Sequence, residues 1–207
     1  MDRTAVKNIY LASRSPRRRE LLKQIGIAFE IVLLRQDVKR DVDVDETPLP
    51  NEKPDAYALR VACAKADLAA RYMSRRSLPG RPVLAADTTV VCEQRIVGKP
   101  ADREDAVSML KSLAGREHEV ITAVALATPD RLEKVVSTSR VWFRPMSEDE
   151  IRRYVATGEP LDKAGAYAIQ GRAAVFVTRI EGSFSGIMGL PLAETADLLR
   201  RFGIDVL

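Results

Sequence analysis

Hydrophobic positions in this chain form short, nearly continuous runs that alternate with stretches of helical periodicity. The run 83–92 is almost entirely apolar and predicts a buried strand, or two strands that meet at Asp87. Residues 55–75 place alanine and leucine side chains at helical spacing and predict one long helix. The runs 120–127 and 135–143 flank a Pro-Asp turn and therefore predict a long hairpin.

Residues that start and stop helices mark the remaining elements. Ser13 or Ser15 can cap a helix whose first residue is Pro16. Further helices are expected at 103–113, at 149–156 and from 191 to near 202, and strands at 9–12, 29–34 and 173–180. Strands and helices that alternate, with one hairpin inserted, predict the α/β class with a mixed sheet. A proline-rich break at 47–54 and the hairpin favour two lobes with a central cleft inside one domain, residues 1–207, without an assignable boundary between the lobes.

Three consecutive arginines, Arg17, Arg18 and Arg19, stand in the first turn of the helix that begins at Pro16. Exposed cations at this end oppose the helix dipole and cost roughly 0.3–1 kcal/mol each. A bound polyanion would reverse the sign of that effect, because backbone N–H groups, serine hydroxyls and guanidinium groups all donate hydrogen bonds to phosphate oxygens. The alternative is a solvated face that Glu20 partly screens, and this segment alone leaves both readings open.

Composition narrows the classes of protein that this chain can represent. With 207 residues, 46% hydrophobic and 30% charged, it has the balance of an ordinary globular protein. No apolar run reaches the roughly 18 residues of a membrane span, and the first residues lack a secretory signal, so a cytoplasmic protein without a membrane partner is expected. The net charge of +4 is interleaved with acids and lacks an aromatic stripe, so stable nucleic-acid binding is not expected.

The histidine and cysteine content limits the available chemistry. His118 is the single histidine, which excludes a histidine zinc cluster and leaves acid–base chemistry mainly to carboxylates, lysines and water. We expect an exposed or structural role for it. Cys63 and Cys92 have no metal-site spacing, and both are expected to be buried and reduced.

Asp87 and Glu46 are the carboxylates best placed for chemistry. Asp87 follows a buried apolar run, where a carboxylate is costly unless it meets a metal, a cation or water, and strand ends of α/β sheets are where ligands bind. The alternative for Asp87 is an Asx turn between two strands. Glu46 ends an acidic loop and could join Mg²⁺ to substrate phosphates, or simply belong to a solvated loop. That loop also contains Asp37, Asp41, Asp43 and Asp45.

Two lysines and one glutamine are further candidates. Lys99 stands between Gly98 and Pro100 on a stiff turn, and Lys65 lies near the buried face of the long helix, where it either extends outward to solvent or points to a ligand. Gln170 offers both a donor and an acceptor, so it could bind the edge of a nucleobase. The alternative is a buried glutamine that is hydrogen-bonded to the backbone.

Seven motifs occur in order along residues 9–202: LASRSPRRRELL, DVDET, RVACAKA, AADTTVV, GKP, LDKAGAYAIQG and GIMGLPL. Together they resemble the Maf family of nucleoside triphosphate pyrophosphatases, long described as septum formation inhibitors. The resemblance implies a Maf-like α/β fold, related in shape to the inosine triphosphate pyrophosphatases, and hydrolysis of a nucleoside triphosphate to the monophosphate and pyrophosphate. The segment around Gln170 is similar to the branch that acts on dTTP and UTP. Three alternatives stay open: the same reaction on 7-methyl-GTP or inosine triphosphate, a non-enzymatic regulator of cell division, and a nucleic-acid-binding module.

The resemblance also implies roles for individual residues. The charged catalytic set corresponds to Glu46, Lys65, Asp87 and Lys99. Asp87 corresponds to the proton acceptor. The phosphate-binding loop corresponds to Ser13, Arg17 and Arg18, and the positions tied to substrate choice correspond to Arg17, Thr88 and Gln170. Glu46 and Asp87 would hold a divalent metal, Mg²⁺ or alternatively Mn²⁺. The implied partner is the nucleoside triphosphate substrate, and a homodimer is common among proteins of this kind.

Overall fold

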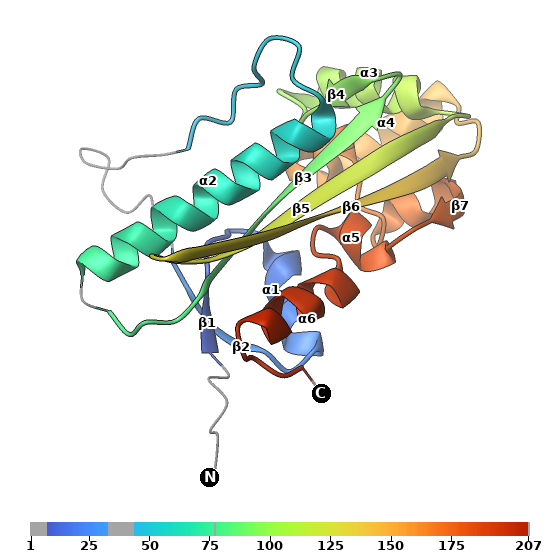
Figure 1. The fold of residues 1–207 in the computed structure, drawn as a ribbon. Coiled ribbons are helices and arrows are strands. Elements are labelled where there is room, and N and C mark those ends of the chain that lie inside the picture. Colours follow the sequence, from blue (N-terminus) through green and yellow to red (C-terminus); the bar gives the residue numbers. More distant parts are fainter. Residues whose placement is uncertain (1–7, 33–43, 77, 207) are drawn as a thin grey trace. The chain divides into compact units, whose positions relative to one another are not determined.

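The computed structural model describes residues 8–32, 44–76 and 78–206 and has the mixed α/β architecture that the sequence predicts (Figure 1). Within these residues, seven strands form one sheet in the order β2-β1-β3-β5-β6-β7, and β4 pairs with β3. The strands are β1 (Asn8–Leu11), β2 (Ala28–Ile31), β3 (Val83–Cys92), β4 (Arg95–Val97), β5 (Glu117–Thr128), β6 (Arg131–Phe143) and β7 (Val177–Glu181). The α-helices are α1 (Pro16–Gln24), α2 (Pro54–Arg75), α3 (Arg103–Leu113), α4 (Glu148–Ala156), α5 (Phe184–Met188) and α6 (Leu192–Arg201). Short 3₁₀ helices are η1 (Glu159–Asp162), η2 (Ala164–Ala166) and η3 (Arg172–Phe176).

The chain divides into two compact units. The first unit contains Met1–Asp87, Thr122–Val136 and Gly189–Leu207, and the second contains Thr88–Ile121 and Ser137–Met188. Among the described residues, no helix is both long and apolar enough to cross a membrane.

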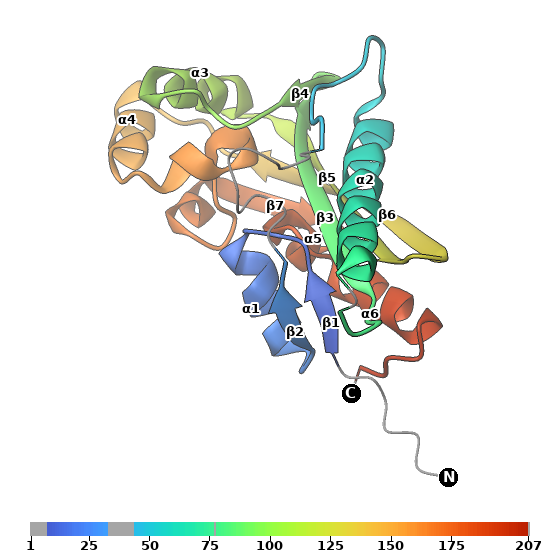
Figure 2. The same ribbon diagram turned by 90° about the vertical axis from the view of Figure 1, so that its left-hand side faces the viewer.

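In the first unit, β1 lies between two parallel neighbours, β2 and β3. The chain moves from β1 to β2 through α1, and then returns past β1 to β3 through α2. Because crossovers between parallel strands are right-handed, connections that run in opposite directions put their helices on opposite faces of the sheet. Accordingly, α1 and α2 lie on opposite sides of β1 and β2 (Figure 2). Ligands of open α/β sheets bind at such a reversal, beyond the carboxyl ends of the strands.

The start of α1 follows the prediction in part. Pro16 is the first helical residue and Gly26, with a φ of +72°, follows the helix. Ser15 occupies the N-cap position, but its side chain makes no capping hydrogen bond. Instead the backbone N–H of Ser15 donates to Oγ of Ser13 at 3.2 Å, so Ser13 orders the loop that enters the helix.

The apolar run 83–92 is one continuous strand, and this corrects one of the two readings of Asp87. Asp87 lies in the interior of β3, not at a junction, so the Asx turn between two strands is wrong. Leu11 pairs with Leu84, and β1 ends at this level, whereas β3 continues to Asp87 and beyond. The carboxylate therefore lies past the carboxyl end of β1, where a ligand of this sheet is expected.

A strand that the sequence analysis did not predict, β4, follows β3 after a tight turn. Glu93 and Gln94 occupy that turn with φ values of 49° and 64°. Two-residue hairpin turns of type I′ need positive φ at both positions, and Asn-Gly is their usual signal. Neither residue carries that signal, so only the pairing of Cys92 with Arg95 reveals the hairpin.

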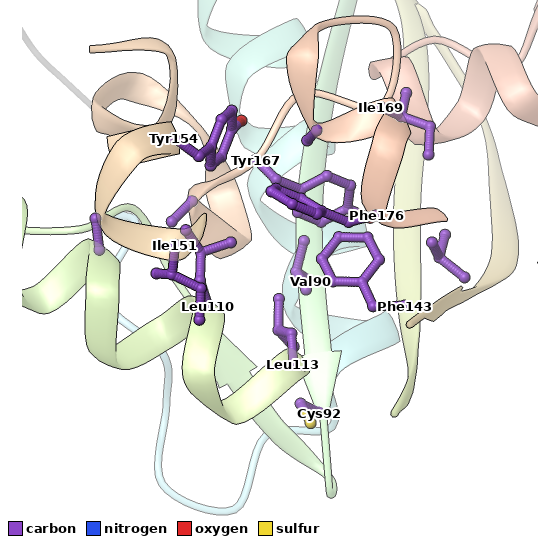
Figure 3. Packing of buried hydrophobic residues seen from close by; sticks show 14 of the residues in the cluster. Val90, Cys92, Leu110, Leu113, Phe143, Ile151, Tyr154, Tyr167, Ile169 and Phe176 are labelled. Carbon is purple, nitrogen blue, oxygen red and sulfur yellow. The ribbon is translucent and has the colours of Figure 1, made fainter. Parts of the chain in front are cut away.

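The second unit is built around a cluster of aromatic and aliphatic side chains (Figure 3). Phe143 makes edge-to-face contacts with the rings of His118, Tyr167 and Phe176, at centroid distances of 4.8, 4.9 and 6.3 Å. Helices α3 and α4 cover this cluster, and both start as predicted. The side chain of Asp102 accepts from the backbone N–H of Asp105, and Ser147 and Glu150 form a capping box.

The strand predicted at 173–180 is wrong in its first half. Residues Arg172–Phe176 form the 3₁₀ helix η3, and the strand β7 begins only at Val177. The reason lies outside the segment: the carboxylate of Glu159 accepts hydrogen bonds from the backbone N–H groups of Arg172 and Ala173, at 3.1 and 3.4 Å. Those groups are thus unavailable to a β ladder. The strand predicted at 29–34 is observed as β2 up to Ile31, and its last two residues lie outside the described ones.

His118 has the structural role that was one of its two expectations. It is buried, and its Nε2 lies 2.9 Å from the hydroxyl of Tyr167. Burial lowers the pKa of His118 to about 4, compared with about 6.5 in an unfolded chain. The native imidazole is neutral, so the unfolded chain takes up the proton first as the pH falls. We therefore expect His118 to remove up to about 1.4 kcal/mol of folding stability per pH unit between about 6.5 and 4.

Urea unfolding near pH 7 and near pH 5 measures this effect in the unmodified protein and in His118→Phe. Phenylalanine keeps the ring contact with Phe143 and cannot take up a proton. The carboxylates are common to both proteins, so the drop in stability on acidification should be smaller in the variant by about 1–2 kcal/mol. Equal drops in the two proteins would contradict a buried neutral imidazole.

Candidate active site

Lys65 joins two carboxylates in the first unit. Its Nζ lies 2.9 Å from Oε1 of Glu46 and 2.9 Å from Oδ1 of Asp87. Lys65 comes from α2, Asp87 from β3, and Glu46 from the extended segment that precedes α2. Lys65 therefore does not simply extend outward to solvent, because its ammonium contacts both carboxylates.

The two carboxylates differ in their exposure to water. The side chain of Asp87 is 13% exposed and that of Glu46 is 53% exposed. A buried carboxylate is costly without a compensating charge, and Lys65 supplies that charge to Asp87. Asp87 is therefore held in a fixed place by its strand and its ion pair, while the Glu46 side chain remains open to solvent.

Arg18 connects the start of α1 to this group of charges. Its Nε donates to the carbonyl oxygen of Gly189 at 2.8 Å, and its Nη1 donates to Oγ of Ser13 at 3.2 Å. Burial lowers the pKa of Arg18, and the negative charges of Asp87 and Glu46 raise it in part. The guanidinium is thus within electrostatic reach of both carboxylates, and the reading of Arg18 as part of a solvated face is wrong.

Arg17 and Arg19 are half-buried on the same turn of α1. Nη2 of Arg19 donates to the carbonyl oxygen of Arg14 at 2.9 Å, so this side chain binds the loop that precedes α1. Arg18, in contrast to Arg19, binds a distant part of the first unit, the carbonyl oxygen of Gly189.

The pair of carboxylates suits a divalent cation. Lys65 shows that oxygens of Glu46 and Asp87 converge on one positive charge. Mg²⁺ is commonly bound by one or two carboxylates together with water and substrate phosphates. No group of three or more His, Cys, Asp or Glu gathers at a metal-binding distance in the part of the chain that the structure describes. The two carboxylates fit an ion that takes its other ligands from water and a phosphate substrate.

Asp45, which precedes Glu46 in the acidic loop, binds the backbone. Oδ1 of Asp45 accepts from the backbone N–H of Thr47 at 2.8 Å, and this bond lowers the pKa of Asp45. Asp45 therefore orders the segment that carries Glu46. Asp37, Asp41 and Asp43 lie outside the described residues.

Three of the predicted site residues, Thr88, Lys99 and Gln170, belong to the second unit. Lys99 is exposed, and the carbonyl oxygen of the preceding Gly98 accepts from the backbone N–H of Gly165 at 2.9 Å. Gly165 has a φ of +70°, and a Cβ there would lie 2.9 Å from Val90. The hydrogen bond joins the turn of Lys99 to the segment that leads to Gln170, and the close approach packs that segment on Val90.

Gln170 is exposed, so its reading as a buried, backbone-bonded glutamine is wrong. The next residue, Gly171, packs so closely on Glu159 that a Cβ would lie 2.4 Å from the carboxylate. Glu159 also accepts a hydrogen bond from the hydroxyl of Tyr154 at 2.9 Å. The turn that presents Gln170 is thus anchored by Glu159, a residue that the sequence analysis did not single out.

The two thiols have no observed role in the site. Cys92 is buried as expected, whereas Cys63 is only half-buried. Burial raises the pKa of both thiols, so each stays protonated at neutral pH.

The chain is similar to known proteins along nearly its whole length. A family model described as Maf-like protein matches residues 8–202. A curated protein of Aromatoleum aromaticum called dTTP/UTP pyrophosphatase is 57% identical over 196 residues, which cover 94% of this chain and 95% of the relative. A protein of the same name from Dechloromonas aromatica is 55% identical and covers 94% of this chain and 97% of the relative. The solved structure of the Staphylococcus aureus Ham1 protein aligns with a TM-score of 0.49 and 18% identity, over 94% of this chain and 97% of that one.

Proposed function

Because this chain belongs to the family of Maf-like proteins, we propose that it is a nucleoside triphosphate pyrophosphatase that hydrolyses dTTP and UTP to the monophosphate and pyrophosphate. Relatives that carry this activity in their names match nearly the whole chain at more than half of the positions. The structural observation that carries the proposal is the contact of one lysine with two carboxylates at the carboxyl end of the sheet.

Binding of the triphosphate rests on fixed cations. A triphosphate carries about four negative charges, so catalysis of its hydrolysis depends mostly on positioning and charge stabilisation. Arg18 is already oriented by Gly189 and Ser13, so little side-chain freedom remains to be lost when phosphate binds. Arg17 and Lys65 supply further positive charge, and the resemblance assigns Lys99 the same role.

Asp87 is the proposed general base. It takes the proton of the attacking water while the new oxygen–phosphorus bond forms at the α-phosphate, and the bond to pyrophosphate breaks in line with it. A base must lie in a fixed place within hydrogen-bond reach of that water. β3 and the ion pair with Lys65 meet the first requirement for Asp87. The more exposed Glu46 lacks a comparable constraint on its side chain.

A divalent metal, Mg²⁺ or Mn²⁺, would be held by Glu46 and Asp87. When bound, such an ion lowers the pKa of water and stabilises charge on phosphate oxygens. Recognition of the pyrimidine is assigned to Gln170 and Thr88 by resemblance, and the exposed carboxamide of Gln170 can both donate and accept hydrogen bonds. A homodimer and the absence of stable nucleic-acid binding belong to the same proposal.

A panel of nucleotides tests the function directly. We expect pyrophosphate release with Mg²⁺ from dTTP and UTP, and chromatography should identify the monophosphate as the product. Greater release from 7-methyl-GTP or inosine triphosphate would overturn the substrate assignment, and diphosphate product would overturn the site of attack. No release from any nucleotide would contradict the enzymatic proposal and favour the non-enzymatic regulator.

A further inference from the structure

The segment that carries Glu46, here called the Glu46 strap (residues 44–52), is bound to α2 through its backbone. The hydroxyl of Tyr57 donates to the carbonyl oxygen of Glu46 at 2.9 Å. Nη1 of Arg60 donates to the carbonyl oxygen of Asp45 at 3.2 Å, and Nη2 donates to that of Thr47 at 3.0 Å. Two side chains of one helix thus bind three consecutive carbonyl oxygens, with Glu46 in the middle.

Arg60 is itself held in place by Glu52, at the end of the strap. Nε of Arg60 lies 2.6 Å from Oε1 of Glu52, and Nη2 lies 2.8 Å from Oε2. Such a two-point bond between guanidinium and carboxylate fixes the plane of the arginine. Oε2 of Glu52 also accepts a hydrogen bond from the backbone N–H of Leu49 at 3.0 Å. Glu52 therefore binds both Arg60 and the backbone of the strap.

The geometry of α2 explains why these bonds act together. Residues three apart lie on the same face of a helix, so Tyr57 and Arg60 both face the strap. Further along α2, Lys65 contacts the side chain of Glu46. The helix therefore contacts Glu46 at both its backbone and its carboxylate.

The backbone bonds matter because the side-chain contact is weak. The side chain of Glu46 is 53% exposed. An ion pair that is open to solvent contributes less free energy than the conformational entropy lost when a single residue of the strap is ordered. The Lys65 contact alone cannot hold Glu46 in position.

We propose that Arg60, assisted by Tyr57, is a positioning residue that holds the Glu46 carboxylate beside Asp87 and Lys65. The proposal rests on the proposed function, because it gives Arg60 a catalytic effect through Glu46. Arg60 is the first residue of the motif RVACAKA, and neither the metal site nor the phosphate-binding residues described above account for it.

A double-mutant cycle on turnover of dTTP tests whether Arg60 acts through Glu46. Arg60→Gln should lower turnover about 10- to 100-fold, the usual effect of losing a residue that orients a ligand to a metal. Adding Arg60→Gln to Glu46→Gln should change turnover by about twofold or less, because the group that Arg60 positions is already lost. Arg71→Gln is the matched control, since Arg71 lies on the same helix in an exposed ion pair with Asp67.

A second measurement does not depend on activity. Hydrogen exchange of the amides in the Glu46 strap, followed in the nucleotide-free protein, should become faster in Arg60→Gln and Tyr57→Phe and remain unchanged in Arg71→Gln. Tyr57→Phe removes a single hydroxyl, so it serves in the same cycle if Arg60→Gln does not fold.

The outcomes separate this inference from the function on which it rests. Losses from Arg60→Gln and Glu46→Gln that multiply in the double variant, or strap exchange that stays unchanged, would overturn the positioning role. An unmodified protein that is inactive on the whole nucleotide panel would overturn the proposed function, and the hydrogen-exchange result would then still decide whether Arg60 orders the strap.

Discussion

Asp87→Asn is expected to lower turnover of dTTP and UTP by roughly 10²–10⁴-fold while the protein stays folded. The asparagine has the same shape as aspartate but cannot take up the proton of the attacking water. It also leaves the Lys65 ammonium with Glu46 as its remaining charged partner of the two. The loss corresponds to about 2.7–5.5 kcal/mol in the activation free energy. Release of pyrophosphate at saturating substrate measures it.

Asp67→Asn is the control for Asp87→Asn. Asp67 lies on α2 and pairs with Arg71 in an ion pair whose two side chains are 46% and 66% exposed, so we expect nearly normal turnover. Circular dichroism and urea unfolding confirm that both variants fold. Near-normal turnover of Asp87→Asn would refute the assignment of the base. If Asp87→Asn keeps its turnover while Glu46→Gln loses roughly 10²–10⁴-fold, the role of the base would move to Glu46.

Phe143→Ala is expected to lower the folding stability by about 3–5 kcal/mol, the range observed when a large aromatic side chain is removed from a core. Phe143 is 3% exposed and lies among the rings of His118, Tyr167 and Phe176. Alanine removes these contacts and leaves a cavity that the rigid rings cannot fill. Urea unfolding at neutral pH measures the change.

Phe184→Ala provides the comparison for Phe143→Ala. Phe184 is 48% exposed at the start of α5, so the same chemical change should cost about 1 kcal/mol or less. Similar losses at the two positions would contradict the view that the aromatic cluster stabilises the second unit.

Elements with local signals could be predicted from the sequence. The helix at 103–113 and the one after Ser147 were predicted because an aspartate or serine at the N-cap binds a backbone N–H three residues later. The hairpin of β5 and β6 was predicted because a Pro-Asp turn separates two apolar runs. These bonds join residues that are close in sequence, so they form wherever the segment lies.

Elements that depend on distant partners were missed. Residues 173–176 have the composition of a strand, yet they form η3 because Glu159 binds the first N–H groups of that helix. The turn at Glu93 and Gln94 adopts positive φ values without glycine or asparagine. The pairing of β4 with β3 compensates the backbone strain of these φ values. Neither the 3₁₀ helix nor the turn has a signal in the sequence of its own segment.

In the candidate site, too, the residues could be predicted from the sequence, but the contacts between them could not. The motifs predicted Glu46, Lys65, Asp87 and Arg18 as candidate site residues. They did not indicate that one ammonium contacts both carboxylates, or that Arg18 binds Gly189, a residue near the other end of the chain. Arg60 could not be distinguished by composition, because arginine is frequent throughout the chain.

The sequence by itself determined the α/β class, most helix starts, the apolar strand that bears Asp87 and the family to which the chain belongs, because these depend on short-range periodicity and on the identity of motif residues. Only the tertiary structure decided which charges meet, which backbone oxygens Arg60 and Tyr57 bind, and where the turn of Gln170 is anchored. Those contacts join residues on different elements, and ion pairs and hydrogen bonds act over a few ångströms, so folding must first bring the elements together.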